Sequence, residues 1–309
     1  MKAHLRARIV FSKSSLSGLT GYTNYTESNI MIDNLIEDIY KRLETPQEVS
    51  EENIDIFCDN LKALLKDRLS EGERSPSLRM SSIGKCSRQV YYDLTEEEEG
   101  EQLLPHTRLK FLYGDLIEEL VLFLAREAGH KVTDQQKTVE LDGVVGHIDA
   151  IIDGHLVDVK SASKFAFKKF KEGTLAEDDP FGYDLQLSGY SAALGDIDGA
   201  FLAMNKESGE LALLKRSSDY MKMNFPHKKI ENHKQNLQSD SPPDRPYEPV
   251  PDGKSGNMKL GVNCSYCSRK QVCWSDSNDG NGLRKFVYSY GPVFLTDVVR
   301  TPKVPEVDI

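Results

Sequence analysis

Residues 146–160 read GHIDAIIDGHLVDVK, and this stretch decides the fold expected for the chain. An Asp-Gly pair between two runs rich in β-branched residues is typical of a two-residue hairpin turn, so positions 153 and 154 are predicted to join two antiparallel strands. Counting outward from this turn, Asp149 lies directly opposite Asp158. Lys160 follows two residues later on the same face of the hairpin.

The two opposed carboxylates are the unusual feature of this hairpin. Residues directly opposite each other have Cβ atoms about 4.5–5.5 Å apart, and like charges there are destabilising. The neighbouring residues are apolar on both faces, which indicates a strand buried on both sides. The pair is therefore predicted either to bind Mg²⁺ or Mn²⁺, which prefer oxygen ligands, or to face solvent at a strand edge with Lys160 as an ion-pair partner.

The composition limits the classes of function. The chain has 309 residues, 39% hydrophobic and 28% charged, which fits a soluble globular protein of one large or two modest domains. Its formal net charge of −10 argues against a protein that coats nucleic acid through bulk charge, but allows a local basic channel. No apolar run approaches the ~20 residues that cross a bilayer, so a membrane-spanning protein is excluded.

Helical and strand periodicities alternate along the chain. Helices are expected twice within 29–69 and at 109–128, 163–171, 183–194 and 220–237, and β-rich segments at 138–160, 200–206 and 210–216. This order predicts an α/β fold with a mixed central β-sheet flanked by helices. We expect a basic flexible arm at 1–28, a helical region at 29–75, a core at 76–240, a linker and cysteine segment at 241–290 that packs back on the core, and an irregular tail at 291–309.

The cysteines and the N-terminus bear on the compartment. Of five cysteines, three crowd into residues 264–273, which does not resemble an extracellular disulfide framework. The first 26 residues are basic, Ser-rich and free of Asp and Glu, which describes either a flexible arm or an organelle transit peptide. We therefore expect a cytoplasmic protein, with the mitochondrial matrix as the alternative.

The spacing Cys264-x₂-Cys267-x₅-Cys273 places three soft ligands within reach of one metal centre. Cys58 and Cys86 are both available as a fourth ligand. Spacing alone leaves that choice open.

Several of these residues together resemble a known superfamily. Gly146-x-x-Asp149 followed by Asp158-x-Lys160 resembles the signature of the PD-(D/E)xK nucleases, which have a restriction-endonuclease-like core. Two further elements resemble the RecB-like branch of that superfamily, namely Gln186-x₃-Tyr190 and Gly114-x₃-Glu118.

This resemblance implies roles for single residues. Glu118, Asp149, Asp158 and the backbone of Val159 would hold the catalytic Mg²⁺ or Mn²⁺, and Lys160 would position the attacking water. Gln186 and Tyr190 share one helical face and would contact a phosphate or the lysine. Helical spacing does not separate Glu118 from its neighbour Glu119, so either acid fits this position.

Residues 81–92, SSIGKCSRQVYY, resemble the segment that opens the nuclease domain of AddB-type nucleases and of CRISPR-associated iron–sulfur exonucleases. That resemblance implies that Cys86, Cys264, Cys267 and Cys273 hold a [4Fe–4S] cluster, with structural Zn²⁺ as the alternative. Cys58 is then left over and is expected in the core of the N-terminal helices.

Basic and aromatic residues interleave in residues 164–171, KFAFKKFK, as they do in channels that bind single-stranded nucleic acid. The nucleic-acid contacts are accordingly predicted at Lys164, Lys168, Lys169, Arg88 and Tyr190. The alternative is an amphipathic helix with Phe165 and Phe167 in the core.

The resemblance implies a metal-dependent DNA exonuclease that hydrolyses phosphodiester bonds in single-stranded DNA or at DNA ends, in recombination, repair or phage DNA processing. The alternatives are an endonuclease or RNA nuclease on the same fold, and a non-catalytic DNA-end-binding iron–sulfur protein. The sequence has no Gly-x₄-Gly-Lys-(Ser/Thr) loop, so a helicase or recombination partner would be a separate chain.

Overall fold

The computed structural model describes residues 31–70, 76–96 and 105–308. The basic arm predicted at 1–28 lies outside the described residues, as does most of the acidic run at 96–101. Among the helices of the described part, none has the length and apolar character that crossing a membrane would require.

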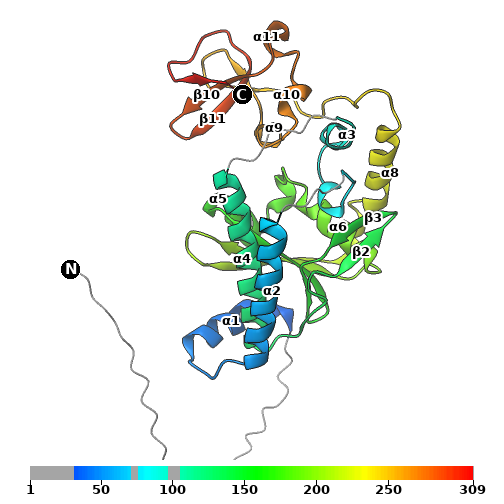
Figure 1. Cartoon of the computed structure of the whole chain (residues 1–309), viewed down its shortest axis with the longest axis vertical. Coiled ribbons are helices and arrows are strands. Elements are labelled where there is room, and N and C mark those ends of the chain that lie inside the picture. Colours follow the sequence, from blue (N-terminus) through cyan, green and yellow to red (C-terminus); the bar gives the residue numbers. More distant parts are fainter. Residues whose placement is uncertain (1–30, 71–75, 97–104, 309) are drawn as a thin grey trace, which may run out of the picture. The chain divides into compact units, whose positions relative to one another are not determined.

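A five-stranded mixed sheet forms the centre of the α/β part (Figure 1). Its strand order is β1-β4-β5-β6-β7, in which β5 and β6 run parallel and the other neighbours antiparallel. The strands are β1 (Val132–Thr133), β4 (Ala150–Ile152), β5 (His155–Ala162), β6 (Gly199–Asn205) and β7 (Leu211–Arg216). The mixed α/β fold expected from the sequence is confirmed.

Helices cover both faces of this sheet. On one face, Val157 and Leu202 pack with residues of α1 and α4, including Leu35 and Val121. On the other face, Phe201 packs with residues of α5 and α6. The helices of this part are α1 (Leu35–Glu44), α2 (Glu51–Leu69), α3 (Ser87–Thr95), α4 (Pro105–Glu127), α5 (Lys164–Glu172), α6 (Tyr183–Ala193), α7 (Ser218–Lys222) and α8 (Pro226–Leu237). Both faces of β5 are therefore buried, as its apolar sequence requires.

A separate hairpin joins β2 (Thr138–Leu141) to β3 (Val144–His147). Asp142 and Gly143 form its turn with φ angles of 48° and 74°. This Asp-Gly turn was expected from the sequence, because both central residues of such a turn need positive φ.

The single long helix expected at 220–237 is instead two helices, α7 and α8. Pro226 begins α8, and the residue before it, Phe225, has a φ of 51°. Proline has no N–H to continue a helix and disfavours helical backbone in the residue before it, so the break falls at this point.

The C-terminal part forms a second five-stranded sheet, entirely antiparallel, with the order β12-β10-β11-β9-β8. Its strands are β8 (Val250–Pro251), β9 (Met258–Lys259), β10 (Arg284–Tyr288), β11 (Gly291–Asp297) and β12 (Glu306–Val307), and its short helices are α9 (Val262–Ser265), α10 (Lys270–Cys273) and α11 (Ser277–Gly280). The irregular tail expected after Tyr290 is therefore wrong. Phe294 and Leu295 of β11 are core residues of this sheet.

Candidate active site

The hairpin between β4 and β5 has the register predicted from the sequence. Ile152 pairs with His155, and Asp153 in the turn has a φ of 50°. Asp149 immediately precedes β4, and its Oδ2 accepts a hydrogen bond of 2.7 Å from the backbone N–H of Val159. The side-chain carboxylate of Asp149 thus accepts the N–H of Val159 in place of a backbone carbonyl. This hydrogen bond holds the carboxylate beside the middle of β5.

Asp158 and Lys160 lie on β5 next to this carboxylate. The Nζ of Lys160 is 2.5 Å from Oδ2 of Asp158, whose side chain is 4% exposed. Oδ2 is buried, and the ammonium group of Lys160 compensates its charge in a close ion pair. Burial opposes the charge on Lys160, but Asp158 and Asp149 outweigh it and raise the lysine pKa.

The acids carry more negative charge than their surroundings compensate. Burial and the charge of Asp158 raise the pKa of Asp149 to about 7, although Lys160 acts in the opposite direction. Burial, followed by the charges of Asp149 and Glu119, raises the pKa of Glu118 to about 9. Such shifts are common where a cation or a proton completes a cluster of carboxylates.

The structure separates Glu118 from Glu119, which the sequence could not do. Glu118 is the acid whose pKa responds to Asp149 and Asp158. Glu119 points elsewhere, because its carboxylate accepts hydrogen bonds from Gln135 at 2.9 Å and from Asn60 at 3.3 Å. Glu118 is therefore the acid that joins the two aspartates.

The sequence analysis missed Gln136, whose Nε2 donates a 2.7 Å hydrogen bond to Oε1 of Glu118. Its backbone N–H also donates to the carbonyl of Asp149. Gln136 has a φ of 55°, and Asp134 two residues earlier has a φ of 53°. Positive φ is uncommon for residues other than glycine, and a glutamine held in it next to two site acids is a sign of a functional loop.

Gln186 and Tyr190 lie on α6, which covers the face of the central sheet that carries Phe201, the residue opposite Asp158. Burial raises the pKa of Tyr190 to about 12, opposed by a hydrogen bond from Gln186, and the charges of Asp158 and Asp149 add to the rise. A Cβ on Gly146 would lie 2.7 Å from the Tyr190 ring, so this position needs glycine to let the ring approach. The structure thus brings the predicted Gln-x₃-Tyr element to the acids.

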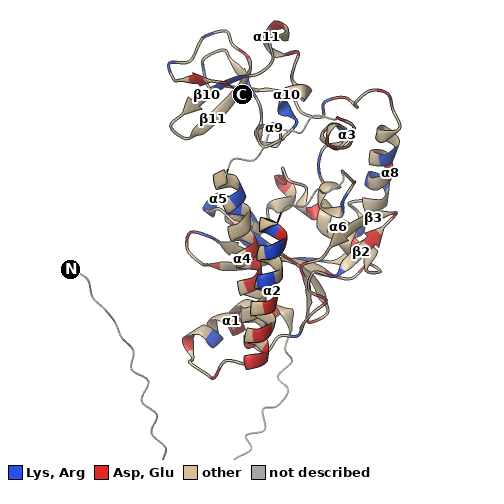
Figure 2. Cartoon of the chain, viewed as in Figure 1, with Lys and Arg blue, Asp and Glu red and all other residues tan. Residues whose placement is uncertain are grey.

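The residues predicted to contact nucleic acid fall into two groups. Lys164 and Lys168 are exposed on α5, a helix whose ribbon is blue at its Lys positions in Figure 2. Lys169 instead pairs with Asp178 at 2.5 Å. Arg88 donates to the carbonyl of Pro243 at 2.7 Å and so contacts the protein itself.

The alternative for this helix, with both phenylalanines in the core, is half right. Phe167 is buried, whereas Phe165 is 81% exposed.

Cys86 precedes the central sheet in the sequence, whereas Cys264, Cys267 and Cys273 lie in the C-terminal part. The charges of these cysteines influence one another's pKa. Burial raises the pKa of Cys264 to about 11 and of Cys267 to about 12, and the charge of Cys86 adds to both shifts. Burial also raises the pKa of Cys86, with a further contribution from Cys273. Cys58 is exposed on α2, so its predicted place in the core is wrong.

Further contacts fix these cysteine segments. The Sγ of Cys86 accepts from the N–H of Gln89 and so caps the N-terminus of α3. Asp93 on the same helix pairs with Arg269 at 3.0 Å, which ties α3 to the segment between Cys267 and Cys273.

Across residues 31–70, 76–96 and 105–308, no three His, Cys, Asp or Glu side chains converge as they would around a single ion. In the acid cluster, the ammonium group of Lys160 is the cation that Asp158 contacts.

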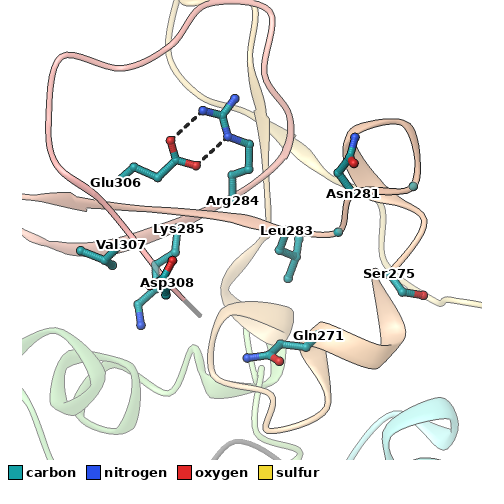
Figure 3. A pocket seen from close by; sticks show the side chains of 11 residues that line it. Gln271, Ser275, Asn281, Leu283, Arg284, Lys285, Glu306, Val307 and Asp308 are labelled. Carbon is teal, nitrogen blue, oxygen red and sulfur yellow. Dashed lines mark hydrogen bonds and ion pairs between the residues drawn. The ribbon is translucent and has the colours of Figure 1, made fainter.

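A pocket of about 500 Å³ lies in the C-terminal part. Figure 3 shows Arg284 and Glu306 facing each other there, joined by two hydrogen bonds of 2.7 Å. None of the predicted site residues lines this pocket.

No protein-family model matches the sequence, and no curated protein matches it. Solved structures with a remote similarity include the following two. The crystal structure of SSO0001 is 16% identical, with 69% of this chain and 94% of that chain covered at a TM-score of 0.39. An alkaline exonuclease from Laribacter hongkongensis is 12% identical, with 57% of this chain and 92% of that chain covered at a TM-score of 0.33. Similarities with TM-scores this low do not bear on function.

Proposed function

We propose that this protein is a metal-dependent nuclease of the PD-(D/E)xK type, acting as an exonuclease on single-stranded DNA or DNA ends. The observation that carries the proposal is the ion pair of Asp158 with Lys160 beside the buried carboxylate of Asp149 at the β4–β5 hairpin. The charges of both aspartates also raise the pKa of Glu118. Gln186 and Tyr190 on α6 complete the set of residue types that the resemblance implies.

The donors present suit a divalent cation. The acids offer oxygen alone, which Mg²⁺ and Mn²⁺ prefer, and the carbonyl of Val159 lies between Asp158 and Lys160 in the chain. Oδ2 of Asp158 is buried against the ammonium group of Lys160, and two carboxyl groups nearby have raised pKa values. A bound Mg²⁺ or Mn²⁺ would supply positive charge that polarises a phosphate and acidifies a water.

The chain's own residues set the rest of the chemistry. The raised pKa of Lys160 keeps its ammonium charged at neutral pH, so it can hold a water or a phosphate oxygen through N–H donors. Gln136 orients the carboxylate of Glu118. Tyr190 is buried and keeps its hydroxyl proton, so it can donate a hydrogen bond.

We further propose that Cys86, Cys264, Cys267 and Cys273 hold a [4Fe–4S] cluster. A single Zn²⁺ needs four ligands at about 2.3 Å from one point, whereas a cluster spreads its four thiolates over four irons. The cysteines influence one another's pKa, which is consistent with their lying near one another. The resemblance of residues 81–92 to iron–sulfur nucleases favours the cluster over Zn²⁺. When bound, it would join the segment before the core to the segment after it.

End-labelled and circular substrates, each single- and double-stranded, test the proposal with anaerobically purified protein and Mg²⁺. We expect release of products from linear single strands or ends and no cleavage of circles. Cleavage of circles would indicate an endonuclease, and cleavage of RNA in preference to DNA would indicate an RNA nuclease. Binding of ends without any cleavage in Mg²⁺ or Mn²⁺ would contradict an enzymatic role.

A further inference from the structure

A row of three aromatic rings leads away from the candidate catalytic lysine. The Nζ of Lys160 lies 4.6 Å from the ring centroid of Tyr183. The ring of Phe181 follows at 5.5 Å from Tyr183, and the ring of Tyr266 follows at 6.0 Å from Phe181. Tyr266 stands between Cys264 and Cys267 in the sequence, so the row joins the hairpin site to the cysteine segment.

The exposure of these rings rises along the row. Tyr183 is half-buried against Phe170, whereas Phe181 is 47% exposed and Tyr266 is 76% exposed. Scattered exposed apolar residues are ordinary, but contiguous exposed rings mark an interaction surface. Packing alone does not account for rings left open at the outer end of the row.

The backbone holds the inner part of the row in place. Gly182, between the first two rings, has a φ of 71°, and a Cβ on it would lie 2.4 Å from Gly84. The carboxylate of Asp179 accepts the N–H of Asp184 and closes this loop. Tyr183 and Phe181 are therefore presented by a rigid turn and not by a free loop.

The charges beside the row indicate which part of a nucleic acid would contact it. Glu177, Asp178 and Asp179 precede Phe181, although Asp178 is paired with Lys169. An acidic loop repels phosphates but does not repel the uncharged face of a base. Bases in a duplex are covered by their neighbours, whereas bases of a single strand are free to stack on rings.

We propose that Tyr183, Phe181 and Tyr266 form a stacking platform for the bases of single-stranded nucleic acid. The platform guides the strand between the cysteine segment and Lys160. Its direction toward a catalytic centre rests on the proposed nuclease function, but its binding of single strands does not.

Binding of a fluorescein-labelled oligothymidine tests this by anisotropy in EDTA, so that no cleavage enters the measurement. We expect Phe181→Ala and Tyr266→Ala each to weaken binding about tenfold, because base–ring stacking is of that order. Their slopes of log affinity against log salt should equal that of the wild type, because no phosphate contact is lost. Lys168→Ala, which removes an exposed cation, should lower the slope instead.

Conservative and matched variants complete the test. Tyr266→Phe keeps the ring and should bind as the wild type does. Tyr290→Ala removes a ring that is 71% exposed but lies outside the row, and should also leave binding unchanged. Melting temperatures and, for Tyr266→Ala, iron content verify folding; Phe181→Leu serves if a variant to alanine does not fold.

Three results would overturn the platform. Phe181→Ala and Tyr266→Ala could bind the single strand as tightly as the wild type, or lose as much affinity for duplex DNA as for the single strand. They could also show a smaller slope of log affinity against log salt than the wild type. A different result would contradict the proposed function and leave the platform intact. In that case the wild type would bind single strands with an affinity that depends on the rings, but would cleave no nucleic acid in Mg²⁺ or Mn²⁺.

Discussion

Asp149→Asn should stabilise the metal-free protein at neutral pH. Burial and the charge of Asp158 raise the pKa of this carboxyl from 3.8 to about 7 in the folded state. In the unfolded chain the group ionises near pH 4, so between about pH 4 and 7 the folded state binds more protons than the unfolded state. Stability therefore falls as pH rises through this window, and it stays reduced above pH 7. Asparagine has no proton to lose and escapes that loss.

The size of the effect follows from the same shift. About three pKa units at 1.36 kcal/mol each give an upper limit of about 4 kcal/mol. Asp149 is partly accessible to solvent, so screening reduces this, and we expect about 2 kcal/mol. For 309 residues, with an unfolding entropy of about 2.1 cal/mol/K per residue, that corresponds to a rise of about 3 °C in melting temperature. The side-chain oxygen of asparagine can still accept the N–H of Val159, so little is lost in exchange.

Thermal unfolding in EDTA at pH 7.5 and at pH 4 measures this difference. The gain should be present at pH 7.5 and mostly lost at pH 4, where the folded-state carboxyl is protonated and about half of the unfolded-state carboxyl is protonated as well. Asp219→Asn changes a side chain that is 95% exposed and should have little effect at either pH. Added Mn²⁺ should stabilise the wild type more than the variant. A lower melting temperature for Asp149→Asn at pH 7.5, or the same gain at both pH values, would refute the reasoning.

Three other substitutions have distinct expected outcomes. Lys160→Ala should abolish cleavage and spare Mn²⁺ binding in calorimetry, because the lysine acts on water or phosphate; loss of metal affinity would mean that it holds the carboxylates in place. Gln136→Ala should weaken Mn²⁺ binding at least about tenfold, because it releases Glu118, whereas Gln135→Ala, which frees Glu119, should not; equal effects would remove the distinction between the two acids. Cys86→Ser should bleach the brown colour and lower the iron content of anaerobically purified protein, and Cys58→Ser should do neither; stoichiometric zinc without iron would contradict the cluster.

Local sequence signals were sufficient for the hairpin and for most elements of the central sheet and its helices, but not for the C-terminal sheet. The Asp-Gly turn at 153–154 has the positive φ angles that the pair favours, and the register that places Asp149 near Asp158 follows from counting outward. Alternation of helical and strand periods likewise predicted the mixed sheet. These features depend on neighbours in the sequence, so they can be read without the fold.

Features that depend on distant contacts could not be predicted. Glu118 and Glu119 are adjacent on one helix, and their different roles appear only through Gln136 and Gln135 from another loop. The row from Tyr183 to Tyr266 joins residues more than 80 positions apart, which no local spacing indicates. Strand β11, expected as an irregular tail, is held by long-range pairing with β10, and it accommodates Pro292 near its start, opposite Val287.

The most direct test of the hairpin as a catalytic centre is the rate of phosphodiester cleavage by Asp158→Asn beside the wild type. Both are measured with Mn²⁺ and an end-labelled single strand, at enzyme concentrations above that of the substrate so that binding does not limit the rate. We expect the variant to fold, to bind the strand in EDTA as the wild type does, and to cleave at less than about a hundredth of the wild-type rate. Asp219→Asn should cleave normally. Cleavage by Asp158→Asn at near the wild-type rate would contradict the assignment of this hairpin as the active site.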